Sequence, residues 1–234
     1  MGCSCRYRTI AVLFALIALV GCQTRSTSQI ITLNKPVGQA RIVLMPPDVE
    51  LSELTAAGLQ EPRADWTSAA RQYLTEALKT ERQAGGVLFT DYDESKIDPA
   101  HLAEVNQFSK LHGAVGTTIL IHRSAVPLPT KQGKLDWTLG DAVQALHKDY
   151  DADYAMFVFI RDSYTSTGRA ALIAAAAVLG VGIRGGTQVG FASLVDLNTG
   201  NIVWFNQLVR ASGDMRTPEK ARETAKTLLK GMPQ

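Results

Sequence analysis

The stretch Tyr154-Ala155-Met156-Phe157-Val158-Phe159-Ile160 is the most hydrophobic strand candidate downstream of the amino-terminal segment. Its apolar side chains are continuous and do not alternate with polar ones. Continuous apolarity is typical of a strand whose two faces are both covered. We therefore expect residues 154–160 to form the central strand of a sheet that has helices on both sides.

Four segments around this strand have the apolar spacing of amphipathic helices. In residues 66–78, apolar side chains recur every three or four residues, which places one apolar stripe along a helix. Another helix begins at Asp98-Pro99, a capping residue followed by proline, and Gly113 and Gly116 obscure its end. The other two segments are residues 139–150 and 218–229.

Short apolar runs bounded by turn residues predict further strands. Asn198-Thr199-Gly200 is the turn signal of a hairpin between the last two runs. The order of elements predicts one α/β or α+β domain over residues 40–234, with a mixed sheet of about five strands, flanking helices and a carboxy-terminal hairpin plus helix. The additional predicted strands are residues 41–45, 87–89, 187–197 and 201–209.

The first 21 residues have the three parts of a secretory signal peptide. Arg6 and Arg8 precede an uncharged apolar run from Ile10 to Val20, and the small Gly21 follows. A membrane-spanning helix needs about 20 apolar residues, so this run is too short to span a bilayer. We therefore predict a signal peptide over residues 1–21 that is removed.

Leu19, Val20, Gly21 and Cys22 resemble the lipobox of bacterial lipoproteins. The resemblance implies that Cys22 is the lipid-attachment residue, carrying a diacylglyceryl thioether and an amide-linked acyl chain such as palmitate. Gln23 in the next position implies sorting to the outer membrane, with the inner membrane as the alternative. Residues 22–39 are polar and predict a flexible tether. An ordinary secretory peptide with an incidental Cys22 is the other interpretation.

Charge and cysteine content narrow the function classes. Cleavage before Cys22 removes Arg6 and Arg8 and no acidic residue, so the remaining chain has 22 basic and 22 acidic residues. A nucleic-acid-binding protein needs a basic surplus or a basic stripe, and the pattern indicates neither. Once Cys22 is lipidated no thiol is left, which excludes disulfides and cysteine-ligated metals.

Asp151-Ala152-Asp153-Tyr154-Ala155 leads into the central strand, and the hairpin reads Ser193-Leu194-Val195-Asp196-Leu197-Asn198-Thr199-Gly200-Asn201-Ile202-Val203-Trp204. These residues resemble the envelope lipoprotein group that contains the curli secretion channel and a lipoprotein activator of a penicillin-binding protein. That group is similar in fold to the amino-terminal domain of the Tol translocation protein B. The resemblance covers residues 41–234 in element order. It implies an envelope lipoprotein that binds or assembles with other proteins and carries no active site.

An alanine- and glycine-rich insertion occupies residues 170–186, and every residue over 170–183 is apolar or glycine. Its small residues form a face on which another helix could approach closely. The segment is a core helix of the domain, a self-association surface or a membrane contact. The insertions of the curli channel alternate like strands and this one does not, so we infer no channel from the resemblance. The candidate partner or oligomer contacts are Ala171, Ala175, Leu179 and Gly182.

No motif predicts a metal, cofactor or catalytic site. Asp149, Asp151 and Asp153 have the alternate spacing of a calcium loop but lack its glycine and its glutamate. Residues 180–185 match the spacing G-x-G-x-x-G, but a helical run precedes them and a strand follows. No histidine pair has zinc-ligand spacing, and Ser193 lacks the flanking glycines of a nucleophile elbow. We expect no cofactor and no enzymatic activity.

These patterns predict a membrane-anchored periplasmic lipoprotein that acts as a protein-binding or assembly component of the cell envelope. A periplasmic hydrolase and a subunit of an oligomeric secretion pore are the alternatives. Asp162, Ser163 and Arg169 follow the central strand, where they line a partner-binding rim or cap the sheet.

Deletion of residues 170–183 tests the insertion. We expect the deleted protein to remain folded and lipidated but to change its oligomer size in detergent, because the segment is a surface contact in this interpretation. Size-exclusion chromatography with light scattering measures the change. An unfolded deletion product would favour the core helix instead.

Overall fold

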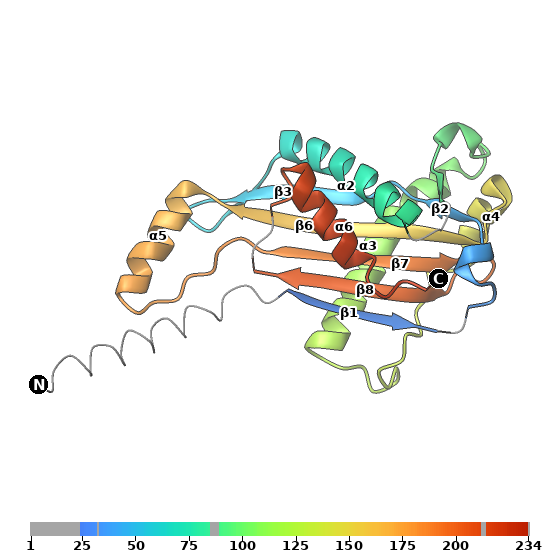
Figure 1. Cartoon of the computed structure of the whole chain (residues 1–234). Helices are drawn as coiled ribbons and strands as arrows, with labels where there is room; N and C mark the ends of the chain where they lie inside the picture. Colours follow the sequence, from blue (N-terminus) through green and yellow to red (C-terminus); the bar gives the residue numbers. More distant parts are fainter. Residues whose placement is uncertain (1–23, 32, 85–88, 212–213, 234) are drawn as a thin grey trace, which may run out of the picture.

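A sheet lies between two layers of helices (Figure 1). The computed structural model describes residues 24–31, 33–84, 89–211 and 214–233. This part of the chain is one α/β domain with eight strands and five α-helices. The elements are β1 (Arg25–Ile30), β2 (Ile42–Leu44), β3 (Asp48–Leu54), β4 (Gln60–Pro62), α2 (Ala64–Ala84), β5 (Phe89–Asp91), α3 (Leu102–Ser124), α4 (Gln144–Tyr150), β6 (Tyr154–Thr165), α5 (Thr167–Val178), β7 (Gln188–Asp196), β8 (Ile202–Arg210) and α6 (Pro218–Leu228).

The predicted central strand is confirmed as β6, which has 12 residues and extends to Thr165. The strand order is β1-β8-β7-β6-β2-β5, with β3 beside β6 and β4 beside β3. β6 is antiparallel to β7 and parallel to both β2 and β3. The mixed sheet is therefore as predicted, with eight strands in place of about five.

Alternate side chains of β6 enter two different hydrophobic cores. On one side, Met156 packs in a core with Leu74 of α2 and Leu228 of α6. On the other side, Phe157 packs in a core with Phe108 of α3. Burial on both faces explains why the apolar sequence of this strand does not alternate.

Two prolines divide the strand beside β6 into β2 and β3. Proline has no N–H and cannot donate to a strand ladder. β2 pairs with β6 as far as Met156, and β3 resumes the pairing at Phe159. Pro46 and Pro47 lie between these two strands. The long strand β6 therefore pairs with β2 along its first part and with β3 along its second part.

The hairpin and the last helix that the sequence predicts near the carboxy terminus are both confirmed. The hairpin of β7 and β8 turns at Asn198-Thr199-Gly200, and Gly200 has a φ of +72°, which glycine adopts at no steric cost. Asp196 Oδ1 accepts hydrogen bonds from two backbone N–H groups of this turn. α6 begins with Pro218 after the capping residue Thr217. Local sequence therefore determines both elements.

The flexible tether predicted over residues 22–39 is wrong for Arg25–Ile30. These residues form β1, which pairs antiparallel with β8. The free edge of β8 satisfies the backbone groups of this polar strand, a tertiary effect with no signature in the strand itself. The lipobox residues Leu19, Val20, Gly21 and Cys22 lie outside the described residues, so the lipid anchor stays a prediction.

Gly113 and Gly116 lie inside α3 and do not mark its end. A Cβ on Gly116 would lie 2.0 Å from a ring carbon of Phe191 in β7. The Phe191 ring is stacked between Phe159 and Phe205, with centroids 4.7 and 5.5 Å away. The ring therefore cannot move aside, and this glycine is what lets α3 approach the sheet.

We expect Gly116→Ala to lower the free energy of unfolding by about 1–3 kcal/mol, because overpacking against the fixed Phe191 ring outweighs the better helix propensity of alanine. Urea denaturation measures the change. Thr117→Ala is the matched control at an exposed position of the same helix, and should alter stability by no more than about 0.5 kcal/mol. Equal stability of Gly116→Ala and the parent would contradict the packing role.

Candidate functional site

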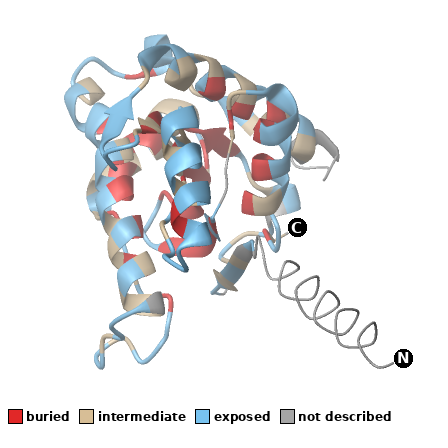
Figure 2. Ribbon diagram, turned by 90° about the vertical axis from the view of Figure 1, so that its left-hand side faces the viewer, coloured by how far each residue is buried: buried red, intermediate tan, exposed pale blue. Residues whose placement is uncertain are grey.

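An exposed apolar helix stands out from one end of the sheet. β6 ends at Thr165, and α5 carries the chain beyond the sheet before a loop returns to β7 (Figure 1). Ala176 alone of the α5 residues is buried, and Figure 2, which faces this end, shows the helix mostly in the exposed colour. The core-helix interpretation is therefore wrong. None of the helices in the described residues has the length and apolarity to cross a membrane.

The four candidate contact residues all lie on this protrusion and are all exposed. Ala171 and Ala175 are one turn apart in α5, Leu179 is the C-cap residue, and Gly182 is in the return loop. Their use as a contact stays a prediction. The G-x-G-x-x-G match over residues 180–185 lies in the same loop, between a helix and a strand, which is the reverse of the order that a dinucleotide site needs.

Polar contacts hold the base of α5 to the sheet. Ser163 Oγ accepts from Thr187 N at 2.8 Å and donates to the carbonyl oxygen of Thr187 at 3.1 Å. Arg169 Nη2 donates to the carbonyl oxygen of Arg184 at 2.9 Å. A Cβ on Gly186 would lie 1.9 Å from Ser163 O, so the return loop passes directly against β6. Of the two interpretations of this polar cluster, these contacts favour capping of the sheet.

Asp162 lies inside β6 and is only 4% exposed. Its Oδ2 accepts hydrogen bonds from Gln188 Nε2 at 3.1 Å and from Met215 N at 3.0 Å. Its Oδ1 has no hydrogen-bond partner in the described part of the chain. Burial raises the pKa of this carboxyl group, and the two hydrogen bonds act in the opposite direction.

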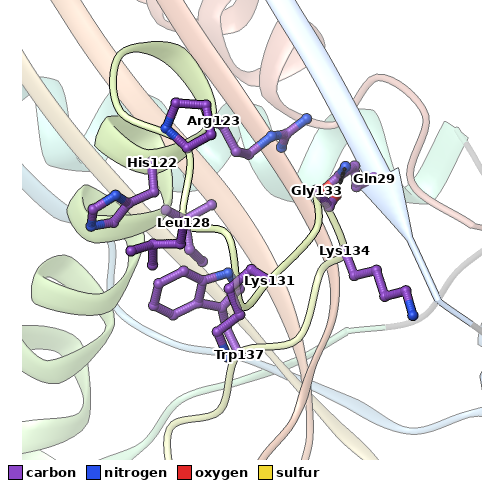
Figure 3. Close-up of a pocket in the computed structure, with 10 residues that line it drawn as sticks. Gln29, His122, Arg123, Leu128, Lys131, Gly133, Lys134 and Trp137 are labelled. Carbon is purple, nitrogen blue, oxygen red and sulfur yellow. Dashed lines mark hydrogen bonds between the residues drawn. The ribbon is translucent and has the colours of Figure 1, made fainter.

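A cavity of about 240 Å³ lies between the carboxy-terminal end of α3, the loop that follows it and β1 (Figure 3). Gln29 of β1 donates from Nε2 to the carbonyl oxygen of Gly133 at 3.1 Å, which ties the loop to the sheet. No acidic side chain is among the lining residues. Lining side chains from α3 and the loop include His122, Arg123, Leu128, Lys131, Lys134 and Trp137.

Arg123 is a partly compensated charge of the cavity, and its guanidinium carbon lies 5.9 Å from the centroid of the Phe205 ring. Its Nη1 is buried and has no hydrogen-bond partner among the described residues. Partial burial lowers the pKa of the guanidinium group. The helix end supplies some compensation, because a cation near the last turn interacts favourably with the helix dipole. A buried donor without a partner is costly, so an anion that accepted its hydrogen bond would be stabilised.

Lys131 and His122 are more constrained than Arg123. The Lys131 ammonium group lies 4.8 Å from the centroid of the Trp137 ring, and it also contacts Asp136. His122 Nδ1 lies 2.7 Å from the carbonyl oxygen of Val126, so Nδ1 carries a proton and donates it there. The Nε2 atom of His122 has no hydrogen-bond partner within the described part of the chain. The cavity therefore offers cationic and polar groups beside an aromatic ring.

One histidine–serine contact has the residue types of a hydrolase. His112 Nε2 lies 2.8 Å from Ser193 Oγ, and the two residues are 1% and 0% exposed. The imidazole packs against Phe157 and Phe191, with centroids 5.2 and 5.1 Å away. Burial lowers the pKa of His112 to about 3, so the ring is neutral. The pair joins α3 to β7 in a closed core and has no access to substrate.

The acidic run of the sequence does not form a calcium loop. Asp153 Oδ2 accepts from Arg41 N at 2.8 Å, and Asp151 pairs with the Arg41 guanidinium group. Asp149 Oδ2 lies 3.1 Å from His101 Nδ1. Asp149 thus faces His101, while Asp151 and Asp153 bind two different groups of Arg41, and the three carboxylates do not converge on one point. No group of three or more histidine, cysteine, aspartate or glutamate residues in the described ranges is placed to hold a metal ion.

No family model and no curated sequence matches this chain. Similar solved structures include the PelC dodecamer from Paraburkholderia phytofirmans, with 12% identity, a TM-score of 0.42, and coverage of 91% of this chain and 99% of that chain. A variant of the same PelC has 13% identity and a TM-score of 0.38, covering 88% and 95%. The LpoB C-terminal domain from Salmonella enterica has 12% identity and a TM-score of 0.28, covering 75% and 84%. At these identities and TM-scores, the likenesses assign the chain to no family.

The cavity has no motif in the sequence, because side chains from three separate segments build it. One feature of the sequence, a long interval without acidic residues, could have indicated the cavity. No acidic residue occurs between Glu104 and Asp136, while that interval holds all of the basic side chains that line the cavity. A local charge bias of this kind is hidden by the neutral balance of the whole chain.

We expect Asp162→Asn to stabilise the fold at pH 7 by on the order of 1 kcal/mol. The raised pKa of Asp162 means that the folded state holds the proton more tightly than the unfolded state, so stability falls as the pH rises through the folded pKa. The amide keeps an oxygen for Met215 N and carries no charge. Thermal unfolding of parent and variant at pH 7 and pH 4 measures the effect. The advantage of the variant should shrink at pH 4, and an advantage that grows there would contradict the assignment.

Proposed function

We propose that this protein is a lipoprotein, anchored through Cys22 in the outer membrane with its domain in the periplasm, that binds another protein of the cell envelope without catalysing a reaction. The lipobox and signal-peptide patterns support the anchor. The observation that carries the binding role is the cavity beside α3, which Arg123 lines and in whose wall the Arg123 Nη1 donor is buried without a partner among the described residues.

The size and charge of the cavity indicate the class of partner. Its volume of about 240 Å³ is below the roughly 300–1,000 Å³ of most small-molecule sites. One or two side chains of a protein partner fill such a space. Arginine and lysine side chains without lining carboxylates favour an acidic segment, because carboxylates accept strong charge-assisted hydrogen bonds from guanidinium groups. Trp137 adds an aromatic surface of the kind that is common in protein interfaces.

The two alternative functions, a periplasmic hydrolase and a subunit of an oligomeric secretion pore, have less support. For a hydrolase, the described residues bring one histidine and one serine together, and His112 and Ser193 are enclosed in the core. For a pore or other homo-oligomer, the exposed α5 offers a surface, and self-association stays a prediction.

We expect Arg123→Ala to weaken binding of a hexaglutamate peptide by about tenfold or more, because charge-assisted hydrogen bonds contribute about 1.5–3 kcal/mol. Isothermal titration calorimetry measures the affinity, and hexaglutamine is the neutral peptide for comparison. Arg222→Ala is the matched control, since Arg222 is exposed on α6 and away from the cavity lining.

Arg222→Ala should bind hexaglutamate like the parent protein. Crosslinking from the cavity loop in intact envelopes then identifies the natural partner, and the crosslink should also depend on Arg123. Equal affinity of the parent for the acidic and neutral peptides would reject the proposed ligand class.

A further inference from the structure

The start of β1 and the base of α5 lie at the same end of the sheet. β1 begins at Arg25, which is paired with Val209. β7 begins at Gln188, which is paired with Arg210 on one side and with Asp162 of β6 on the other. Figure 1 shows β1 and β7 starting, and β6 ending, at the end from which α5 projects. The chain therefore enters the domain beside α5.

Only Gln23 and Thr24 separate Cys22 from the first residue of β1. A span of three residues reaches about 11 Å at most when fully extended. α5 has 12 residues, which corresponds to a length of about 18 Å. A lipid on Cys22 thus holds this end of the sheet close to the membrane surface, and a helix longer than the spacer projects from that end.

The surface at this end suits a lipid bilayer. The most exposed apolar side chains of the protrusion are at its tip, with Val178 86% and Leu179 80% exposed, while Leu172 nearer the sheet is 42% exposed. Val181 in the return loop and Leu59 in the turn between β3 and β4 are also exposed. The turn with Leu59 lies beside α5, because Arg169 Nη1 donates to the carbonyl oxygen of Ala56 at 3.4 Å.

The charge of α5 and its return loop also favours a lipid surface, although Glu61 in the neighbouring β4 is exposed. No acidic residue occurs between Asp162 and Asp196, whereas Arg169 and Arg184 flank the apolar segment. The exposed Arg184 can approach lipid phosphates. An interfacial segment of this kind binds through buried apolar surface together with attraction of its basic residues to anionic lipid headgroups.

We propose that the tip of α5 inserts into the membrane leaflet that holds the lipid on Cys22, an inference that rests on the proposed lipid anchor. The protein then has two attachments to one leaflet, which fix the orientation of the sheet and direct the cavity beside α3 towards the periplasm. A second copy of this chain fits less well, since a helix pair buries a stripe along its length. Here the large apolar side chains that are most exposed, Val178 and Leu179, lie at the tip.

The test uses the full lipidated protein in vesicles of phosphatidylethanolamine and phosphatidylglycerol. Val178→Cys provides one thiol for an environment-sensitive fluorophore, because lipidated Cys22 leaves no other. Lipids with spin-labelled acyl chains should quench this fluorophore. The matched control is Lys148→Cys, an exposed position in α4 directly before the start of β6 and thus at the opposite end of the sheet; it should show no quenching.

Leu179→Asp in the Val178→Cys protein should abolish the quenching while circular dichroism stays unchanged, since Leu179 is exposed and supports no core. Absence of quenching at Val178→Cys in protein whose mass confirms lipidation would overturn the inference and leave the proposed function intact. Disulfide-linked Val178→Cys dimers without quenching would overturn it in favour of self-association. An unlipidated Cys22 would overturn the anchor and this inference together, while hexaglutamate binding would report on the cavity independently.

Discussion

Burial of β6 on both faces is the constraint on which the rest of the structure depends. A strand that is apolar at every position needs a hydrophobic layer on each side. Met156 and Phe157 point into opposite cores, so α2 and α6 are required on one face and α3 and α4 on the other. The glycine at 116 in α3 follows from this arrangement, because the helix must approach Phe191 in the next strand.

β6 continues beyond the apolar core, and its last buried residues are polar. Asp162 and Ser163 are buried polar residues whose hydrogen bonds reach Gln188, Met215 and Thr187. These contacts hold the two chain segments that lead to and from α5. The base of the exposed helix is thereby anchored to the end of the sheet. Asp162 Oδ1 is buried without a hydrogen-bond partner in the described residues, which lowers the stability of the fold. A pair of apolar side chains at this position would not carry this penalty.

The parts of the fold that local signals determine were predictable from the sequence. The continuous apolar run predicted the central strand, and the Asn198-Thr199-Gly200 turn predicted the hairpin. β1 was not predictable, because the polar residues 25–30 become a strand only when the edge of β8 is available. The exposed position of α5 was not predictable either. Its composition indicates an apolar helix but does not indicate whether the helix is buried in the domain. The cavity depends on Arg123 and on Gln29, which are far apart in the chain.

β1 connects the two candidate surfaces. Its first residue lies near the end of the sheet from which α5 projects, and Gln29 near its other end donates to the loop that lines the cavity. Along its length it pairs with β8, and Ser26 Oγ donates to Asn206 Oδ1 at 3.1 Å. Asn206 in turn donates from Nδ2 to carbonyl oxygens at the end of α6. Hydrogen bonding over the whole of β1, rather than apolar burial, fixes this edge strand to the sheet despite its polar sequence.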